Sequence, residues 1–182
     1  MQYGGVISGN NVKFQRIVVY KMNSEERRAF VRNHRTAVFG FARATDGPSM
    51  SCVYYVMDGD DILVSTMAGR AKARAVQRNP KVSLCVLDEN WPPTYLLVYG
   101  EAKIKEDGGG DLLIRICELM AKQAMPDTER STLIDLAKEE HRVIVRITPY
   151  STFESSPRHV YQPNDVASLT HDYGASLLWN AD

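Results

Sequence analysis

Short apolar runs separated by turn signals are the feature that most constrains how this chain can fold. The run Cys52 to Val56 is unbroken, and it belongs to a predicted strand over residues 49–57. A continuous apolar run predicts a strand that is covered on both faces. Asp58-Gly59-Asp60 then predicts a hairpin into a second strand over 61–66. Strands joined in this way indicate antiparallel β architecture.

Further runs of the same kind complete the predicted sheet. In the strand over 95–105, Leu96, Val98, Ala102 and Ile104 share one face, and Gly100 is expected to bend it. The other strands are expected over 36–44, 82–87 and 141–153. These runs predict a mainly β (α+β) fold with about six strands and flanking helices. The N-terminal segment 12–22 is compatible with a strand or an arm.

Helices are expected between the strands. Ser24 is the predicted cap of a helix that ends near Asn33, and Asn79-Pro80 ends a helix over 69–78. Asp111 is the predicted cap of another helix, which has an apolar stripe. A fourth helix is expected over 131–140. The stripe is formed by Leu112, Ile116 and Leu119.

Length and charge exclude several classes of protein. A chain of 182 residues with 44% hydrophobic residues can bury its own core as one domain. The 22 basic residues balance 22 acidic ones, which argues against a nucleic-acid partner. No apolar run approaches the roughly 18 residues of a membrane span, and the first residues lack signal-peptide features. We therefore expect a cytoplasmic protein without a membrane partner.

Cysteines and histidines give no sign of a metal site. Cys52, Cys85 and Cys117 are widely spaced among apolar residues, which predicts buried reduced thiols. The histidines lack the spacing of metal ligands, so no metal is expected. They are His34, His141, His159 and His171.

The neutral total conceals a basic segment. Residues 62–87 contain no acidic residue and carry a formal charge of +5. Such a local concentration of charge indicates an anionic ligand better than the net charge does. The five bases are Arg70, Lys72, Arg74, Arg78 and Lys81.

The order of residues at the start of this segment suits a phosphate. Ser65 and Thr66 can donate from hydroxyls, and Gly69 lets backbone N–H groups approach. Arg70 and Lys72 add charge at a helix start. The alternative is a solvated helix face, since Arg70, Arg74 and Arg78 share one side. Neither a Walker A loop nor a G-x-G-x-x-G fingerprint is present.

The run from Ile62 to Arg74, continued by Arg78-Asn79-Pro80 and by Gly100-Glu101-Ala102, resembles the pyridoxamine 5'-phosphate oxidase-like split-barrel superfamily. The flavin and deazaflavin oxidoreductase branch is the most similar part. The resemblance covers about residues 25 to 153. It implies a six-stranded antiparallel split β-barrel that forms a homodimer, with the cofactor at the subunit interface and a small-molecule substrate.

The resemblance also assigns cofactor-binding residues. It implies that Ser65, Thr66, Arg70 and Lys72 hold the cofactor phosphate, with Gly69 and Arg74 beside them. The strand from Ser49 to Val53 would run along the ring system through Ser49, Met50 and Ser51. Arg43 is a further candidate.

The sequence departs from the vitamin B6 oxidase itself. No arginine follows Arg158, whereas that enzyme grips its substrate with an arginine motif near the C-terminus. The Gly-Arg-x-Lys-x-Arg form of residues 69–74 resembles the deazaflavin-using branch more, which implies coenzyme F420 as the cofactor, with FMN as the alternative. We therefore expect an oxidoreductase dependent on F420 or FMN, and we name no catalytic side chain.

Two other hypotheses remain open. The same barrel can hold a flavin or haem as a non-catalytic carrier or sensor, or the basic helix can be an interaction module without a cofactor. We expect residues 1–153 to form the cofactor-binding domain and residues 154–182 an arm that packs on the barrel, the dimer or the groove. One ring of Tyr54 and Tyr55 should face the barrel and the other the outside, at a dimer interface. Trp91 is expected either to stack on a cofactor or to cap the barrel.

Overall fold

A computed structural model describes residues 3–8, 11–16, 21–90, 94–154, 163–164 and 174–181, the first two ranges by their backbone alone. Trp91, His159 and His171 lie outside the described residues.

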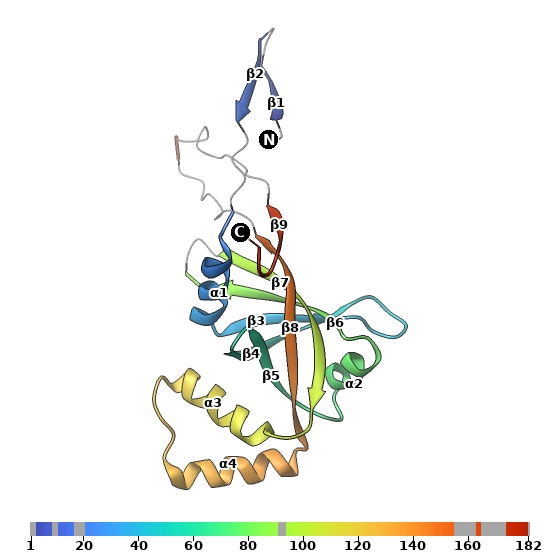
Figure 1. Ribbon diagram of the computed structural model, residues 1–182, viewed down its shortest axis with the longest axis vertical. Helices are drawn as coiled ribbons and strands as arrows, with labels where there is room; N and C mark the ends of the chain where they lie inside the picture. The colour runs from blue at the N-terminus through green and yellow to red at the C-terminus, as the bar shows by residue number, and fades with distance from the viewer. Residues whose placement is uncertain are drawn as a thin grey trace.

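Six antiparallel strands form a closed barrel, as the sequence predicts (Figure 1). Hydrogen bonding joins them in the order β5-β4-β3-β6-β7-β8, and pairing of β5 with β8 closes the ring. A further strand, β9 (Ala175–Leu178), extends the sheet beyond β8. The six barrel strands are β3 (Thr36–Phe41), β4 (Ser49–Asp58), β5 (Asp61–Met67), β6 (Lys81–Asp88), β7 (Thr94–Lys105) and β8 (Arg142–Glu154).

The two ends of the long strand β8 pair with different strands. Its first half pairs with β5, from Met67 opposite Arg142 to Ile62 opposite Ile147. Its far end pairs with β9, where Ser151 lies opposite Leu178. One strand therefore closes the barrel and anchors the C-terminal segment.

Four helices flank the barrel in the described part of the chain, and α3 and α4 lie side by side at one end of it (Figure 1). Two predicted caps are wrong. Asn23, not Ser24, caps α1, because its side chain accepts from the Glu26 N–H while the Glu26 carboxylate accepts from the Asn23 N–H, both at 2.8 Å. Gly108 precedes α3 in place of Asp111, with φ of 82°. The helices are α1 (Ser24–Asn33), α2 (Ala71–Arg78), α3 (Gly109–Ala121) and α4 (Asp127–Glu139).

The N-terminal residues form a separate two-stranded sheet. Its strands, β1 (Tyr3–Ser8) and β2 (Asn11–Arg16), are antiparallel, with Ser8 opposite Asn11. Of the two alternatives for residues 12–22, a strand or an arm, a strand is present as β2, and β1 was not predicted.

The barrel interior confirms the predicted face of β7. Leu96 and Val98 are fully buried and Ala102 nearly so. The strand changes register between Tyr99 and Gly100, as the expected bend requires. A Cβ at Gly100 would lie 2.5 Å from Ile147 Cγ2, so this position needs glycine for the close approach of β8.

Three expectations about burial are wrong. The outer face of β4 is not covered, since Met50 is 72% and Tyr54 44% exposed, while Tyr55 points into the core as expected. Cys52 is exposed, and Cys85 and Cys117 are only half-buried, although all three are free thiols. Leu119 on α3 is 37% exposed, because only the first turns of the predicted stripe, with Leu112 and Ile116, pack on the barrel.

A buried arginine holds the C-terminal segment. Arg27 is fully buried; its Nη1 donates to the Met22 carbonyl at 2.5 Å and its Nη2 to the Leu178 carbonyl at 2.9 Å. The same guanidinium also donates to the carbonyls of Trp179 and Ala181. Arg27 thereby joins α1 to β9.

We expect Gly100→Ala to destabilise the barrel by about 1–3 kcal/mol, because the added methyl group overlaps Ile147 and overpacks the interior. Gly47→Ala is the matched control, since nothing lies within 4 Å of its Cβ. Denaturant unfolding of both variants measures the difference. Equal stability of the two would contradict the close approach at Gly100.

We expect Arg27→Met to lower the free energy of unfolding by about 3 kcal/mol or more, because it leaves several buried carbonyls without donors. Arg32→Met, on the same helix, replaces an exposed arginine that makes no side-chain hydrogen bond or ion pair within the described residues, and it should cost about 1 kcal/mol or less. Chemical unfolding of the pair is the test, and similar losses would show that Arg27 does not anchor the segment.

Candidate functional site

A cavity of about 460 Å³ lies between β4, the end of β5 and the start of α2. It brings together six of the predicted site residues, which come from three elements. They are Ser49, Ser51, Ser65, Thr66, Arg70 and Lys72. Its other lining residues are Phe41, Cys52, Val53, Tyr54, Met67, Ala71 and Arg142.

Four other candidates lie outside the cavity lining. Met50 is exposed on β4, and Gly69 lies in the turn before α2. Arg74 donates to the Gly69 carbonyl, so its guanidinium already has a partner beside the cavity. Arg43 donates to the Gly47 carbonyl at 2.9 Å and pairs with Asp46, within its own loop.

The turn from β5 into α2 positions the basic side chains. The Arg70 N–H donates to the Met67 carbonyl at 3.1 Å, and Arg70 is the N-cap of α2. Its guanidinium has no acceptor atom, so the Arg70 side chain does not cap the first amides of α2. Arg70 therefore stands at the positive end of a helix dipole.

The surroundings of Lys72 in the cavity change its pKa. Burial, and secondly the charge of Arg70, lower its pKa to about 8. Its ammonium lies 5.0 Å from the centre of the Phe39 ring. An anion bound here would relieve the repulsion between Lys72 and Arg70.

The hydroxyl groups offer further hydrogen bonds. Ser51 Oγ is buried without a hydrogen-bond partner in the described structure, and Thr66 is 5% exposed. A buried hydroxyl left unpaired costs free energy that a ligand atom can recover. The Ser65 and Thr66 hydroxyls, the Arg70 guanidinium and the Lys72 ammonium are the donors that a phosphate group takes, so the residues present fit a phosphorylated ligand.

Arg142 is a functional candidate that the sequence did not reveal. Its Nη1 lies 3.2 Å from Ser65 Oγ, and its Nε donates to Glu140 Oε2 at 2.5 Å. Only the closing of the barrel brings β8 beside β5, so no local pattern could have placed Arg142 near Ser65. The cavity therefore holds three cations, from Arg70, Lys72 and Arg142.

The alternative hypothesis, a basic helix face that is simply solvated, is correct for Arg74 and Arg78. Arg74 and Arg78 are exposed, and Arg78 donates to the Ala42 carbonyl at 3.3 Å. Lys72, by contrast, is half-buried in the cavity wall. The basic helix thus divides into a cavity side and a solvent side.

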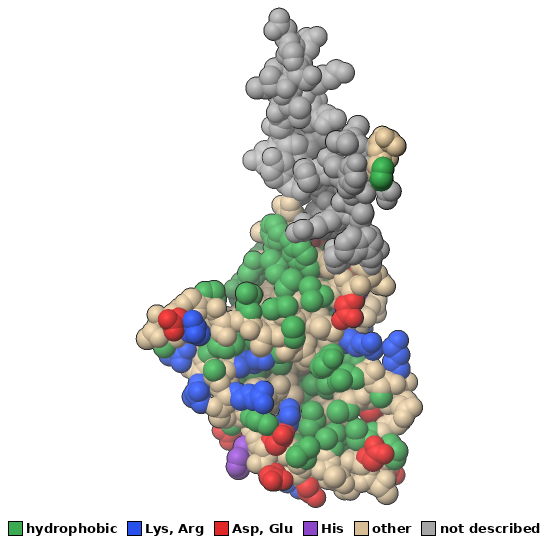
Figure 2. Space-filling model, turned by 180° about the vertical axis from the view of Figure 1, so that it is seen from behind, with side chains coloured by type: hydrophobic (Ala, Val, Ile, Leu, Met, Phe, Trp, Pro, Cys, Tyr) green, Lys and Arg blue, Asp and Glu red, His purple; other side chains and the backbone are tan. Residues whose placement is uncertain are grey.

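An exposed apolar face adjoins the cavity. Met50, Cys52 and Tyr54 lie exposed on β4, and the last two also line the cavity. Figure 2 shows a face of the molecule on which basic side chains gather beside a broad apolar area.

Among the described helices, none has the length and apolar character needed to cross a bilayer.

Comparison with solved structures finds the same fold in other proteins. A conserved hypothetical protein from Mycobacterium tuberculosis is 26% identical, with a TM-score of 0.60 over 75% of this chain and 84% of that one. An F420 reductase is 20% identical, with a TM-score of 0.56 over 69% and 94%. An FAD-binding protein from Mesorhizobium loti is 18% identical, with a TM-score of 0.50 over 75% and 94%.

The sequence comparisons identify the family. No curated protein matches the chain. The family model described as pyridoxamine 5'-phosphate oxidase matches residues 24–149, which begin at α1 and end within β8. The resemblance to the split-barrel superfamily is therefore confirmed. Because the match spans most of the chain, this protein belongs to the pyridoxamine 5'-phosphate oxidase family.

Proposed function

We propose that the protein is an oxidoreductase that binds a phosphorylated flavin-type cofactor in the cavity between β4, β5 and α2. The observation that carries the proposal is the convergence of Ser65, Thr66, Arg70 and Lys72 on one cavity. Coenzyme F420 is the favoured cofactor, on the Gly-Arg-x-Lys-x-Arg form of residues 69–74, with FMN as the alternative. The F420 reductase and the FAD-binding protein of the same fold are compatible with this choice.

The phosphate end of the cavity supplies most of the binding energy in this proposal. Arg70 and Lys72 give charge-assisted hydrogen bonds, each worth about 1.5–3 kcal/mol, and Ser65 and Thr66 donate from neutral hydroxyls. Barrel hydrogen bonds fix Ser65 and Thr66 on β5, and the bond from the Arg70 N–H to the Met67 carbonyl fixes the turn into α2, so the anchor is preorganised.

The β4 side of the cavity orients the ring system. Ser49 and Ser51 offer hydroxyls along one strand, while Phe41, Val53 and Tyr54 supply apolar contacts. When bound, the cofactor supplies the hydride chemistry for a small organic substrate. The protein's part is to hold the ring, to orient it and to limit the access of water.

A second copy of the chain is the proposed cover of the exposed β4 face. Met50, Cys52 and Tyr54 leave an apolar surface that is continuous with the cavity lining. Association through this face would place the cofactor at a subunit boundary and complete its enclosure.

We expect the double variant Arg70→Ala/Lys72→Ala to lose at least about 100-fold in cofactor affinity, because two charge-assisted hydrogen bonds are removed. Fluorescence titration with F420 and with FMN measures the loss. Arg78→Ala/Lys81→Ala is the matched control, since it removes the same charge from outside the cavity lining. Equal affinity of the two double variants would rule out this phosphate site.

Turnover separates the enzyme from its alternatives. Reduced cofactor and a panel of conjugated and ketone substrates should give oxidation of the cofactor. Tight binding without turnover of any substrate would instead indicate a carrier or sensor, and no binding of either cofactor an interaction module.

Cofactor affinity should fall as pH rises from about 7 to 9. The Lys72 ammonium binds phosphate only when protonated, and its pKa of about 8 in the free protein makes that fraction small at the upper end. Lys72→Arg keeps its charge over this range, so its affinity should stay nearly constant. Parallel pH profiles for the two proteins would contradict a role for Lys72 in holding the phosphate.

A further inference from the structure

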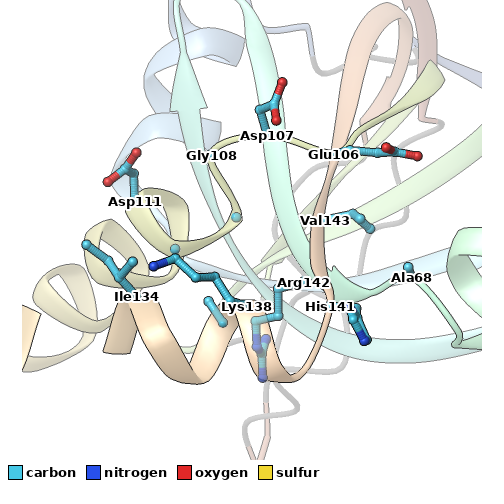
Figure 3. A pocket seen from close by; sticks show the side chains of 13 residues that line it. Ala68, Glu106, Asp107, Gly108, Asp111, Ile134, Lys138, His141, Arg142 and Val143 are labelled. Carbon is cyan, nitrogen blue, oxygen red and sulfur yellow. The ribbon is translucent and has the colours of Figure 1, made fainter. Parts of the chain in front are cut away.

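Arg142 lies at the start of β8, directly after the turn that leaves α4 (Figure 3). Backbone contacts with two other elements hold it there. Met67 at the end of β5 pairs with Arg142, and the Ala68 N–H donates to the His141 carbonyl at 2.9 Å. The start of α3 packs on the same point, since a Cβ at Gly109 would lie 2.4 Å from the Arg142 carbonyl oxygen. The backbone of Arg142 is therefore fixed between β5 and α3.

The turn into β8 brings two charged side chains together. Glu140 is the C-cap of α4, and His141 follows with a φ of 47°, which lets the chain turn into β8. Arg142 Nε donates to Glu140 Oε2 at 2.5 Å, and the two side chains are only 23% and 25% exposed. Solvent screens an ion pair less when it is partly buried. Glu140 therefore holds the Arg142 guanidinium in one orientation.

The guanidinium that is held in this way reaches Ser65 on the neighbouring strand. Arg142 Nη1 donates to Ser65 Oγ at 3.2 Å. A guanidinium has only donors, whereas a serine hydroxyl has one proton and two lone pairs. The bond therefore occupies a lone pair of Ser65 and leaves its proton free, and none of the residues that the structure describes accepts that proton. Because Ser65 lines the cavity, a ligand there can accept it.

Arg142 itself is less available to a ligand than Arg70 or Lys72. Its Nε and Nη1 already have partners, and the Glu140 carboxylate offsets its charge. A hydroxyl that accepts a hydrogen bond from a cation becomes a stronger donor, because each bond in a chain polarises the next. Arg142 would thus act on a bound anion through Ser65.

We infer that Arg142 is a positioning residue, which holds the Ser65 hydroxyl as a donor toward the cofactor phosphate, and that Glu140 holds Arg142 for this role. This role rests on the proposed function, in which Ser65 binds the phosphate. It has an unusual consequence for an acidic residue. Removal of a negative charge near an anion site should ordinarily strengthen the binding of the anion, whereas removal of Glu140 should weaken it.

A double-mutant cycle between Arg142 and Ser65 tests this role. Arg142→Met, Ser65→Ala and the double variant are titrated by fluorescence with FMN and F420, and with riboflavin and the deazaflavin core as ligands that lack the phosphate. Arg115→Met is the matched control, because its guanidinium donates to the Met57 carbonyl at 3.1 Å, outside the cavity lining. Thermal unfolding checks that each variant is folded.

We expect Arg142→Met and Ser65→Ala each to weaken binding of the phosphorylated cofactor by about three- to tenfold, the range of one hydrogen bond. The double variant should bind within about twofold of Ser65→Ala alone. Arg115→Met, and all affinities for the phosphate-free ligands, should stay within about twofold of the wild type. Losses that multiply in the double variant, an equal loss for the phosphate-free ligands, or no loss in Arg142→Met would overturn the role.

Glu140→Ala gives an independent measurement that leaves Arg142 in place. We expect it to weaken the phosphorylated cofactor by at least about twofold, and to have no effect in the Ser65→Ala background. Stronger binding would show that Glu140 acts by its charge alone and would overturn its part in the role. A wild type that binds neither FMN nor F420 more tightly than the phosphate-free ligands would overturn the phosphate site as well, whereas failure of the cycle alone leaves the proposed function intact.

Discussion

The pairing of β5 with β8 is the interaction on which the rest of the structure depends. It turns an open sheet into a closed barrel, and it places Met67 opposite Arg142 at the point where β5 leaves the sheet. The chain then turns into α2, so Ser65, Thr66, Arg70 and Lys72 meet around one cavity. Without this pairing, no other strand contact would bring Arg142 close to Ser65. The pairing that closes the barrel therefore also brings the residues of the candidate site together.

The charge of the cavity follows from the same geometry. The chain as a whole is neutral, with 22 basic and 22 acidic residues. Three basic side chains nevertheless line this cavity, of which Arg142 is paired with Glu140, and burial makes Lys72 easier to deprotonate than an exposed lysine. Cations held close together in a partly buried site repel one another, and an anion removes that repulsion. The site is therefore suited to one phosphate group rather than to a polyanion spread over a surface.

Local patterns in the sequence were sufficient for the barrel strands. Turn signals such as Asp58-Gly59-Asp60 and the alternation in β7 depend only on neighbouring residues, and all six strands are present. The cap of α1 was misplaced by one residue, because Asn23 and Ser24 are both good caps and only the reciprocal bonds with Glu26 distinguish them. Four of the six cavity residues, Ser65, Thr66, Arg70 and Lys72, could be predicted from one short segment, whereas Ser49 and Ser51 came from the family resemblance.

Features that depend on distant parts of the chain could not be predicted. Arg142 lies 77 residues from Ser65, and the Arg27 guanidinium bonds carbonyls more than 150 residues away. The outer face of β4 was misjudged for a related reason. An apolar run is the same whether its second face is covered by its own chain or left exposed for a ligand or another subunit. The sequence therefore predicted the apolar character of that face and could not predict what covers it.

The most direct test of the phosphate anchor leaves the protein unchanged and removes the phosphate from the ligand. Titration of the wild type with FMN and riboflavin, and with F420 and its phosphate-free deazaflavin core, compares ligands that share a ring system. We expect the phosphorylated member of at least one pair to bind about 100-fold more tightly or better, which corresponds to about 2.7 kcal/mol. Equal affinity within both pairs would contradict the assignment of Ser65, Thr66, Arg70 and Lys72 as a phosphate site.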